Sequence, residues 1–169
     1  VGTSAIRDAE NRGDLIARAT EIGIPLEAIS GEEEARLSFN AVRLDPVWRK
    51  SGPLMVIDIG GGSTEVIEGT SESEHLISRV SLPVGAVRLS ESILLSDPPT
   101  ILQLHKATEL TQDAFGGVEI DGSSYTAVGV GGTLTTMAAV HLQMPVKNLS
   151  QLHGHKLSSG EVERQVDLY

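Results

Sequence analysis

The stretch that decides the fold is Leu54-Met55-Val56-Ile57-Asp58-Ile59-Gly60-Gly61-Gly62-Ser63-Thr64-Glu65-Val66-Ile67. Its apolar first half is typical of a buried β-strand, which breaks at three glycines and resumes as a second strand. Glycine has no Cβ, so Gly60, Gly61 and Gly62 can adopt positive φ angles and turn their N–H groups towards one anion. We therefore predict a β-turn-β phosphate cradle.

Two carboxylates flank this turn. Asp58 stands where the first strand ends and Glu65 where the second begins. Acidic side chains repel phosphate unless a hard cation such as Mg²⁺ lies between them, so the pair predicts a metal site. The glycines are not followed by Lys and then Ser or Thr, which excludes a P-loop, and they do not form a helix-starting G-x-G-x-x-G. The alternative is a glycine-rich hairpin bulge without a ligand, in which an acid that ends a buried strand would be costly.

The composition narrows the function classes. The 169 residues are enough for one domain with a good core, and the lack of cysteine excludes disulfides and thiolate metal sites. A formal net charge of −10 and only 3% aromatic residues argue against nucleic-acid binding. No apolar run approaches the ~20 residues of a membrane span, and the start shows no leader pattern. We expect a cytoplasmic protein without membrane contact.

The rest of the pattern favours an α/β fold. Beside the glycine hairpin we predict helices over residues 8–23, 32–42, 86–95, 100–115 and 134–141, and strands over 24–29, 74–82 and 124–130. Both ends look cut, because residues 1–5 read as the end of a strand and a capping box at 158–161 opens a helix in which the chain stops. We expect a middle section of a longer protein.

A second glycine turn follows the last predicted strand, in Gly129-Val130-Gly131-Gly132-Thr133. A strand that enters a helix through glycines presents free N–H groups and the positive end of the helix dipole to an anion. Alone, such a turn is a routine packing device. Together with the first turn, at the carboxyl ends of parallel strands, it predicts a nucleotide or polyphosphate cleft.

A third candidate is the helix start Ser30-Gly31-Glu32-Glu33-Glu34. Acidic side chains in the first turn stabilise a helix because they lie near the positive end of its dipole, and this alone explains the presence of Glu32 and Glu33 without any function. Three in a row exceed that need, and a carboxylate that points into a phosphate cleft could deprotonate water as a general base. Arg7 could neutralise phosphate oxygens.

These motifs together resemble the exopolyphosphatase/guanosine pentaphosphate phosphohydrolase family, and they follow one another along the chain in the same order as in that family. The segments that carry the resemblance are residues 3–11, 29–37, 56–65 and 129–133. It implies the ribonuclease-H-like fold of the actin, sugar-kinase and chaperone ATPase superfamily, with two domains facing a cleft. Residues 1–43 would then be the C-terminal part of the first domain, 44–52 a linker and 53–169 most of the second domain.

The resemblance also implies roles for single residues. Glu34 falls on the family's proposed catalytic base, while Asp58 and Glu65 are associated with Mg²⁺ and its water. The implied phosphate-binding set is Arg7, Gly60, Gly61, Gly62, Ser63, Thr64, Gly131, Gly132 and Thr133. The family's first phosphate loop is missing from this sequence, so we expect the chain by itself to be inactive. Helix 8–23 would expose apolar surface, so we also expect homo-oligomers such as a dimer.

The function predicted from these features is hydrolysis of the terminal phosphoanhydride of inorganic polyphosphate or guanosine pentaphosphate, with Mg²⁺ as cofactor. Two alternatives stay open. An ATP-binding kinase or ATPase of the same superfamily would share both glycine turns, and a non-catalytic sensor of guanosine tetra- or pentaphosphate would bind without turnover. If Glu34 is not the base, Glu33 is the next candidate.

Overall fold

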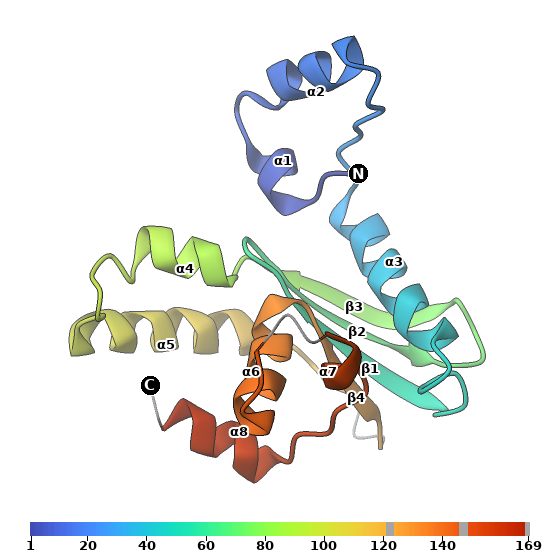
Figure 1. The fold of residues 1–169 in the computed structure, drawn as a ribbon, viewed down its shortest axis with the longest axis vertical. Coiled ribbons are helices and arrows are strands. Elements are labelled where there is room, and N and C mark those ends of the chain that lie inside the picture. Colours follow the sequence, from blue (N-terminus) through green and yellow to red (C-terminus); the bar gives the residue numbers. More distant parts are fainter. Residues whose placement is uncertain (121–123, 146–148, 168–169) are drawn as a thin grey trace.

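A computed structural model describes residues 1–120, 124–145 and 149–167. Within them a sheet is formed by β1 (Pro53–Ile59), β2 (Thr64–Thr70), β3 (Leu76–Leu82) and β4 (Thr126–Val130), in the order β3-β2-β1-β4 (Figure 1). β1 pairs antiparallel with β2 and parallel with β4, and β2 pairs antiparallel with β3. The predicted glycine hairpin is therefore the β1–β2 connection, and the two glycine turns follow neighbouring parallel strands.

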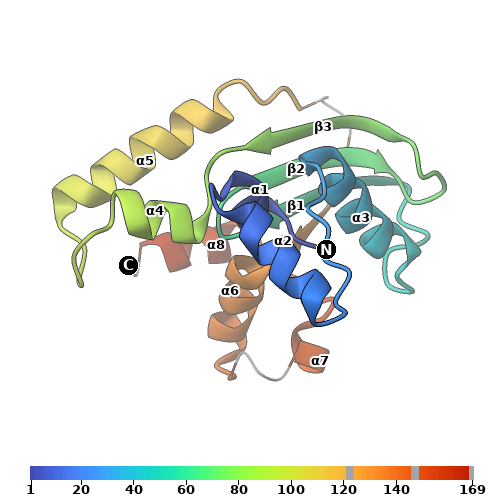
Figure 2. The same ribbon diagram turned by 90° about the horizontal axis from the view of Figure 1, so that it is seen from above.

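In chain order the described helices are α1 (Ser4–Asp8), α2 (Arg12–Glu21), α3 (Gly31–Leu44), α4 (Ala86–Ser92), α5 (Ile101–Phe115), α6 (Gly132–Leu142), α7 (Leu149–Leu152) and α8 (Ser159–Val166). Two of the described helices, α3 and α6, make the main contacts with this sheet. α3 crosses the sheet, while α1 and α2 extend from its N-terminal end and lie mostly clear of the strands (Figures 1 and 2). α6 contacts β4 and β1 directly, since it starts where β4 ends.

The buried face of α3 forms the main core with the sheet. Its N-cap is Ser30, whose hydroxyl accepts a hydrogen bond from the Glu33 N–H, and its buried positions 35, 39 and 42 recur at helical spacing. The core residues are Ala35, Phe39, Val42, Leu54, Val56, Ile67 and Val128. Strand register puts Asp58 and Glu65 on this same sheet face, at the turn end of it, because side chains on one face recur every second residue. The core thus fixes where α3 meets the two carboxylates.

Two predictions in the first 30 residues are wrong in detail. The predicted helix 8–23 is two helices, because Ala9 is extended (φ −69°, ψ 129°) and ends α1 before α2 begins. The predicted strand 24–29 makes only an isolated parallel bridge, between Ala28 and Gly2, among the described residues. A strand needs a partner along its whole length, and here Gly2 alone supplies one before α1 begins. Gly23 does stop α2, with φ at +78°.

The predicted domain boundary at residue 43 stays a prediction. The same structure packs α3, which that boundary assigns to the first domain, on the sheet assigned to the second. α1 and α2 by contrast bury little, since Ala19 is the only buried residue in α2, and Leu15 and Ile22 are 46% and 73% exposed. The expected apolar surface on the 8–23 segment is therefore present.

Phe39 tests the packing of α3 on the sheet. Its fully buried ring lies over Gly69 of β2, where a Cβ would come within 2.4 Å of the ring. We expect Phe39→Ala to lower the free energy of unfolding by about 3–5 kcal/mol, because the ring is lost and a cavity remains. Leu37→Ala, on the same helix at a side chain that is 42% exposed, is the control and should change it by less than about 1 kcal/mol. Equal losses in urea denaturation would show that α3 is not seated on this face.

Candidate functional site

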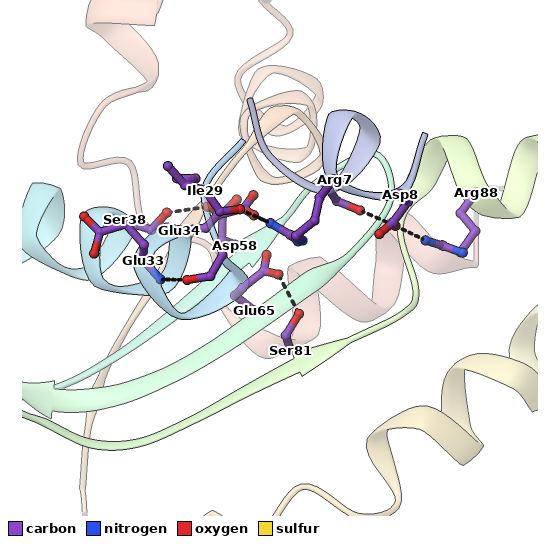
Figure 3. Close-up of polar contacts among 12 residues, drawn as sticks. Arg7, Asp8, Ile29, Glu33, Glu34, Ser38, Asp58, Glu65, Ser81 and Arg88 are labelled. Carbon is purple, nitrogen blue, oxygen red and sulfur yellow. Dashed lines mark hydrogen bonds and ion pairs between the residues drawn. The ribbon is translucent and has the colours of Figure 1, made fainter. Parts of the chain in front are cut away.

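Three carboxylates meet at the turn end of the α3 face of the sheet (Figure 3). Asp58 and Glu65 are directly opposite partners in the antiparallel register of β1 and β2, and Glu34 reaches them from the first turn of α3. Glu65 is only 1% exposed. Burial raises the pKa of Glu65, and the nearby charges of Glu34 and Asp58 raise it further, while hydrogen bonds from Ser81 and Ser63 lower it. Like charges placed opposite each other in a sheet are destabilising, so this cluster needs a proton or a cation.

Two hydroxyl groups orient the carboxylates of the strands. The Ser38 hydroxyl donates to Asp58 Oδ2 at 2.7 Å, and the Ser81 hydroxyl donates to Glu65 Oε1 at 2.9 Å. The sequence interpretation missed both serines. Ser38 follows Glu34 by four residues and so shares its helix face, and Ser81 is the β3 partner of Glu65 in the register. Helical spacing could have found Ser38, whereas Ser81 depends on a register that the sequence does not specify.

The three acids at the start of α3 are separated by their arginine partners. Glu32 pairs with Arg79 at 2.7 Å, and Glu33 makes a two-bond pair with Arg36, which lowers the pKa of Glu33. Glu33 and Arg36 are bound to each other within one helix turn. Of the three acids, Glu34 is the one whose charge acts on Glu65, so the geometry separates it from Glu33 as a candidate base.

Arg7 lies beside Glu34 instead of pointing into an open phosphate site. Its Nη1 donates to Glu34 Oε2 at 3.1 Å and to the Ile29 carbonyl oxygen at 2.9 Å. One guanidinium thus ties α1 to the start of α3 and fixes the carboxylate of Glu34 (Figure 3). The predicted role of Arg7 as a phosphate ligand remains a prediction, and its observed contacts are with the candidate base.

The two glycine turns face one pocket of about 540 Å³. Its lining residues are Ile59, Gly60, Gly61, Ala86, Gly131, Gly132, Thr133, Thr136 and Met137. Gly62, Ser63 and Thr64 are not among them. Ser63 is buried beside Glu65, and the Thr64 hydroxyl donates to the Val84 carbonyl at 2.7 Å. The structure therefore brings five of the predicted phosphate-binding glycines and threonines together in one wall and turns Thr64 away.

Positive φ occurs in the second glycine turn, not in the first. Gly60, Gly61 and Gly62 are not among the described glycines with positive φ, so the expectation of left-handed glycines there is wrong. Gly131 has φ +89°, and a Cβ on it would lie 2.6 Å from the Ile59 carbonyl oxygen and 3.1 Å from Asp58 Oδ1. The β4–α6 turn can approach the end of β1 only because residue 131 is glycine.

The comparisons with known proteins agree with this geometry. The model of the Ppx/GppA phosphatase family matches residues 1–167. The chain belongs to this family. Exopolyphosphatase 2 of Mycobacterium tuberculosis is 34% identical over 163 residues, covering 90% of this chain and 50% of that protein. Exopolyphosphatase 1 of Mycobacterium bovis is 47% identical over 98 residues, covering 57% of this chain and 28% of that protein.

Solved structures of the family share the fold. The crystal structure of the Aquifex aeolicus Ppx/GppA family member has a TM-score of 0.78 and 32% identity, and the match covers 98% of this chain and 53% of that one. An exopolyphosphatase from Cytophaga hutchinsonii gives a TM-score of 0.69 at 26% identity, over 97% of this chain and 54% of that one. The chain has the fold of the actin-like ATPase superfamily and spans about half the length of the curated relatives it matches.

The carboxylate cluster offers two oxygen-bearing side chains to a divalent metal ion, which is not a complete set of ligands. Among residues 1–120, 124–145 and 149–167, no group of three or more His, Cys, Asp or Glu is arranged to hold a metal ion by itself. Mg²⁺ is commonly held by one or two carboxylates, and waters and phosphate oxygens complete its ligands. Asp58 and Glu65 could supply the carboxylates.

None of the described helices is long and apolar enough to cross a membrane.

The buried Glu65 of this Ppx/GppA family chain gives a stability test. Because its pKa is raised from 4.5, folded Glu65 keeps a proton that the unfolded chain releases, so stability falls as pH rises from 4.5 through the folded pKa. Glu65→Gln removes this loss. We expect the melting temperature of Glu65→Gln to exceed that of the wild type by roughly 2–5 °C, in buffer without divalent metal and at a pH above the pKa of folded Glu65. Below pH 4.5 the difference should vanish.

Glu33→Gln is the control of opposite sign, because Arg36 lowers the pKa of Glu33 and its ionisation stabilises the folded chain. Melting temperatures of the wild type, Glu65→Gln and Glu33→Gln, measured across pH, test whether the pKa of folded Glu65 is raised. Parallel curves for wild type and Glu65→Gln would mean that Glu65 ionises freely and is not confined by its neighbours.

Proposed function

We propose that the protein containing this chain hydrolyses the terminal phosphoanhydride bond of inorganic polyphosphate. The observation that carries the proposal is the meeting of Glu34, Asp58 and Glu65 beside a pocket built from both glycine turns. Gly131 joins the two features, since it lines the pocket and its Cβ position lies 3.1 Å from Asp58 Oδ1. The names of the relatives, exopolyphosphatases 1 and 2, support polyphosphate as the substrate.

The residues divide the chemistry among them. The glycine turns would receive the terminal phosphate through backbone N–H groups, and Glu34 would take a proton from the attacking water. The water oxygen forms a bond to the terminal phosphorus while the bridging P–O bond breaks, which yields orthophosphate and a chain shorter by one phosphate. Mg²⁺, when held by Asp58 and Glu65, would neutralise the phosphate charge. Arg7 keeps the Glu34 carboxylate in place, since it binds one of its oxygens.

Substrate choice, location and assembly belong to the same proposal. Guanosine pentaphosphate, the other substrate that the sequence resemblance implies, carries the same phosphoanhydride chemistry. We propose a cytoplasmic protein that assembles as a homodimer, for which the exposed Leu15 and Ile22 of α2 are suitable apolar surface.

The proposed activity is tested by measuring the release of orthophosphate by the full-length protein from polyphosphate, guanosine pentaphosphate and ATP in parallel. Turnover of ATP alone would favour the kinase or ATPase alternative, and binding of guanosine pentaphosphate without turnover would favour the sensor.

Glu34→Gln tests the general base. In the full-length protein we expect kcat for polyphosphate to fall by roughly 10²–10⁴ with KM changed little, because the amide keeps the shape and cannot accept the proton. Glu33→Gln is the matched control, since its carboxylate is bound to Arg36 on the outer side of the helix, and its kcat should stay within about threefold of the wild type. The reverse order of the two effects would move the base to Glu33.

Asp58→Asn tests the metal site. Replacing one anionic ligand by a neutral amide weakens a hard-cation site, so the Mg²⁺ concentration for half-maximal activity should rise by at least about tenfold. Isothermal titration with Mg²⁺ gives a second reading that does not depend on turnover. A magnesium dependence equal to that of the wild type in both measurements would make Asp58 a structural residue.

A further inference from the structure

The start of α4 binds the first glycine turn through three hydrogen bonds. The Ala86 N–H donates to the Gly60 carbonyl at 3.1 Å, and the Arg88 N–H donates to the Gly61 carbonyl at 2.9 Å. The third bond comes from the side chain, since Arg88 Nε donates to the Gly62 carbonyl at 2.7 Å. Three consecutive carbonyl groups of the turn are thus held by one short segment.

This arrangement sets the direction of the N–H groups in the turn. In a trans peptide the C=O and the following N–H point to opposite sides, so carbonyls fixed towards α4 turn the next N–H groups away from it. In the described part of the chain, the N–H groups of Gly61 and Gly62 have no hydrogen-bond acceptor. Gly61 lines the pocket between the two turns. The segment therefore prepares a set of free donors beside that pocket.

Gly85 allows the close approach that these bonds need. A Cβ at residue 85 would lie 2.5 Å from the Gly61 carbonyl oxygen and 2.6 Å from its carbonyl carbon. The φ angle of Gly85 is −158°, which any residue can adopt, so the requirement is one of space. A side chain here would force α4 off the glycine turn.

The Arg88 guanidinium also reaches α1. Its Nη2 lies 3.2 Å from Asp8 Oδ2 (Figure 3). The Ser4 hydroxyl donates to the same oxygen at 3.2 Å. α1 touches the turn directly as well, because a Cβ on Gly62 would lie 2.6 Å from Ser4 Oγ. One planar side chain therefore connects α4, the glycine turn and α1, the helix that also carries Arg7.

We propose that Arg88 is a positioning residue for phosphate binding, which holds the glycine turn with its N–H groups free and fixes the turn against α1. The inference rests on the proposed function, in which this turn receives the terminal phosphate. The role requires the fork geometry of arginine, because Nε and Nη2 bind two different acceptors at once. A lysine ammonium is a point charge on a flexible stem and would reach one of them at a time.

Arg88→Lys in the full-length protein tests the proposal. We expect KM for polyphosphate to rise by roughly tenfold and kcat to change by less than about threefold, since binding and not proton transfer is disturbed. Asp8→Asn removes the charge that Arg88 and the Ser4 hydroxyl share and leaves the Arg88 bond to the Gly62 carbonyl in place, so it should give a smaller rise in KM. Arg79→Lys is the matched control: Arg79 is an arginine paired with an acid, Glu32, and is 42% exposed, against 43% for Arg88. Its KM should stay at the wild-type value.

A second measurement does not depend on turnover. In protein with ¹⁵N-labelled glycine, titration with inorganic phosphate should shift the Gly61 and Gly62 amide signals in the wild type and in Arg79→Lys, and much less in Arg88→Lys. Equal KM values and equal phosphate shifts in Arg88→Lys and Arg79→Lys would overturn the role of Arg88. A wild type that releases no phosphate from polyphosphate would instead refute the proposed substrate, and the amide shifts alone would then decide about Arg88.

Discussion

The structure depends on a pair of carboxylates that face each other on the two central strands of the sheet, next to the turn that joins them. The antiparallel register of β1 and β2 sets Asp58 directly opposite Glu65, and Glu65 is almost completely buried. Neither carboxylate can move away without breaking the hairpin, because their backbones are part of the ladder. The pair is therefore a stable feature only if something positive or a proton reduces the repulsion. The Ser38 and Ser81 hydroxyls meet part of that requirement, since each donates a hydrogen bond to one of the two carboxylates.

The same helix supplies the core and the site. α3 buries Phe39 on the sheet and presents Glu34 and Ser38 to the carboxylates, one turn apart along its axis. Because a well-packed core resists small displacements, the position of Glu34 relative to Asp58 is set by the seating of Phe39 over Gly69. The missing Cβ at Gly69 is thus a condition for the site as well as for the core, although it lies at the other end of the strand.

The sequence was sufficient for features that depend on local order and insufficient for those that depend on contacts between distant segments. The hairpin, the strand–glycine–helix turn and the helix that starts after Ser30 follow from patterns within a few residues, and all are present in the structure. The pairing of Arg7 with Glu34, 27 residues apart, does not follow from any local pattern. Nor does the location of positive φ: three adjacent glycines permit it, yet hydrogen bonds from α4 hold that turn in another conformation.

The segment 24–29 failed for a related reason. Its apolar composition suits a strand, but a strand forms only where another offers a row of partners, and the described chain offers Gly2 alone. Thr64 shows the same limit on a smaller scale. A threonine beside a glycine turn looks like a phosphate ligand, whereas the alternation of β2 that buries Glu65 on one face sends Thr64 to the other.

Helix geometry explains why one acid among three can act at the site. Successive residues of an α-helix are turned by about 100°, so Glu32, Glu33 and Glu34 leave α3 in three directions. Each direction meets a different arginine: Arg79 on β3, Arg36 one turn along the same helix and Arg7 on α1. The first two pairs lie at the surface, where water screens them and they add little to stability. The third is more buried, with Glu34 16% exposed, and it lies between α1 and the carboxylate pair of the sheet. A run of identical residues therefore yields one functional group, and its neighbours around the helix, not its place in the run, determine which one.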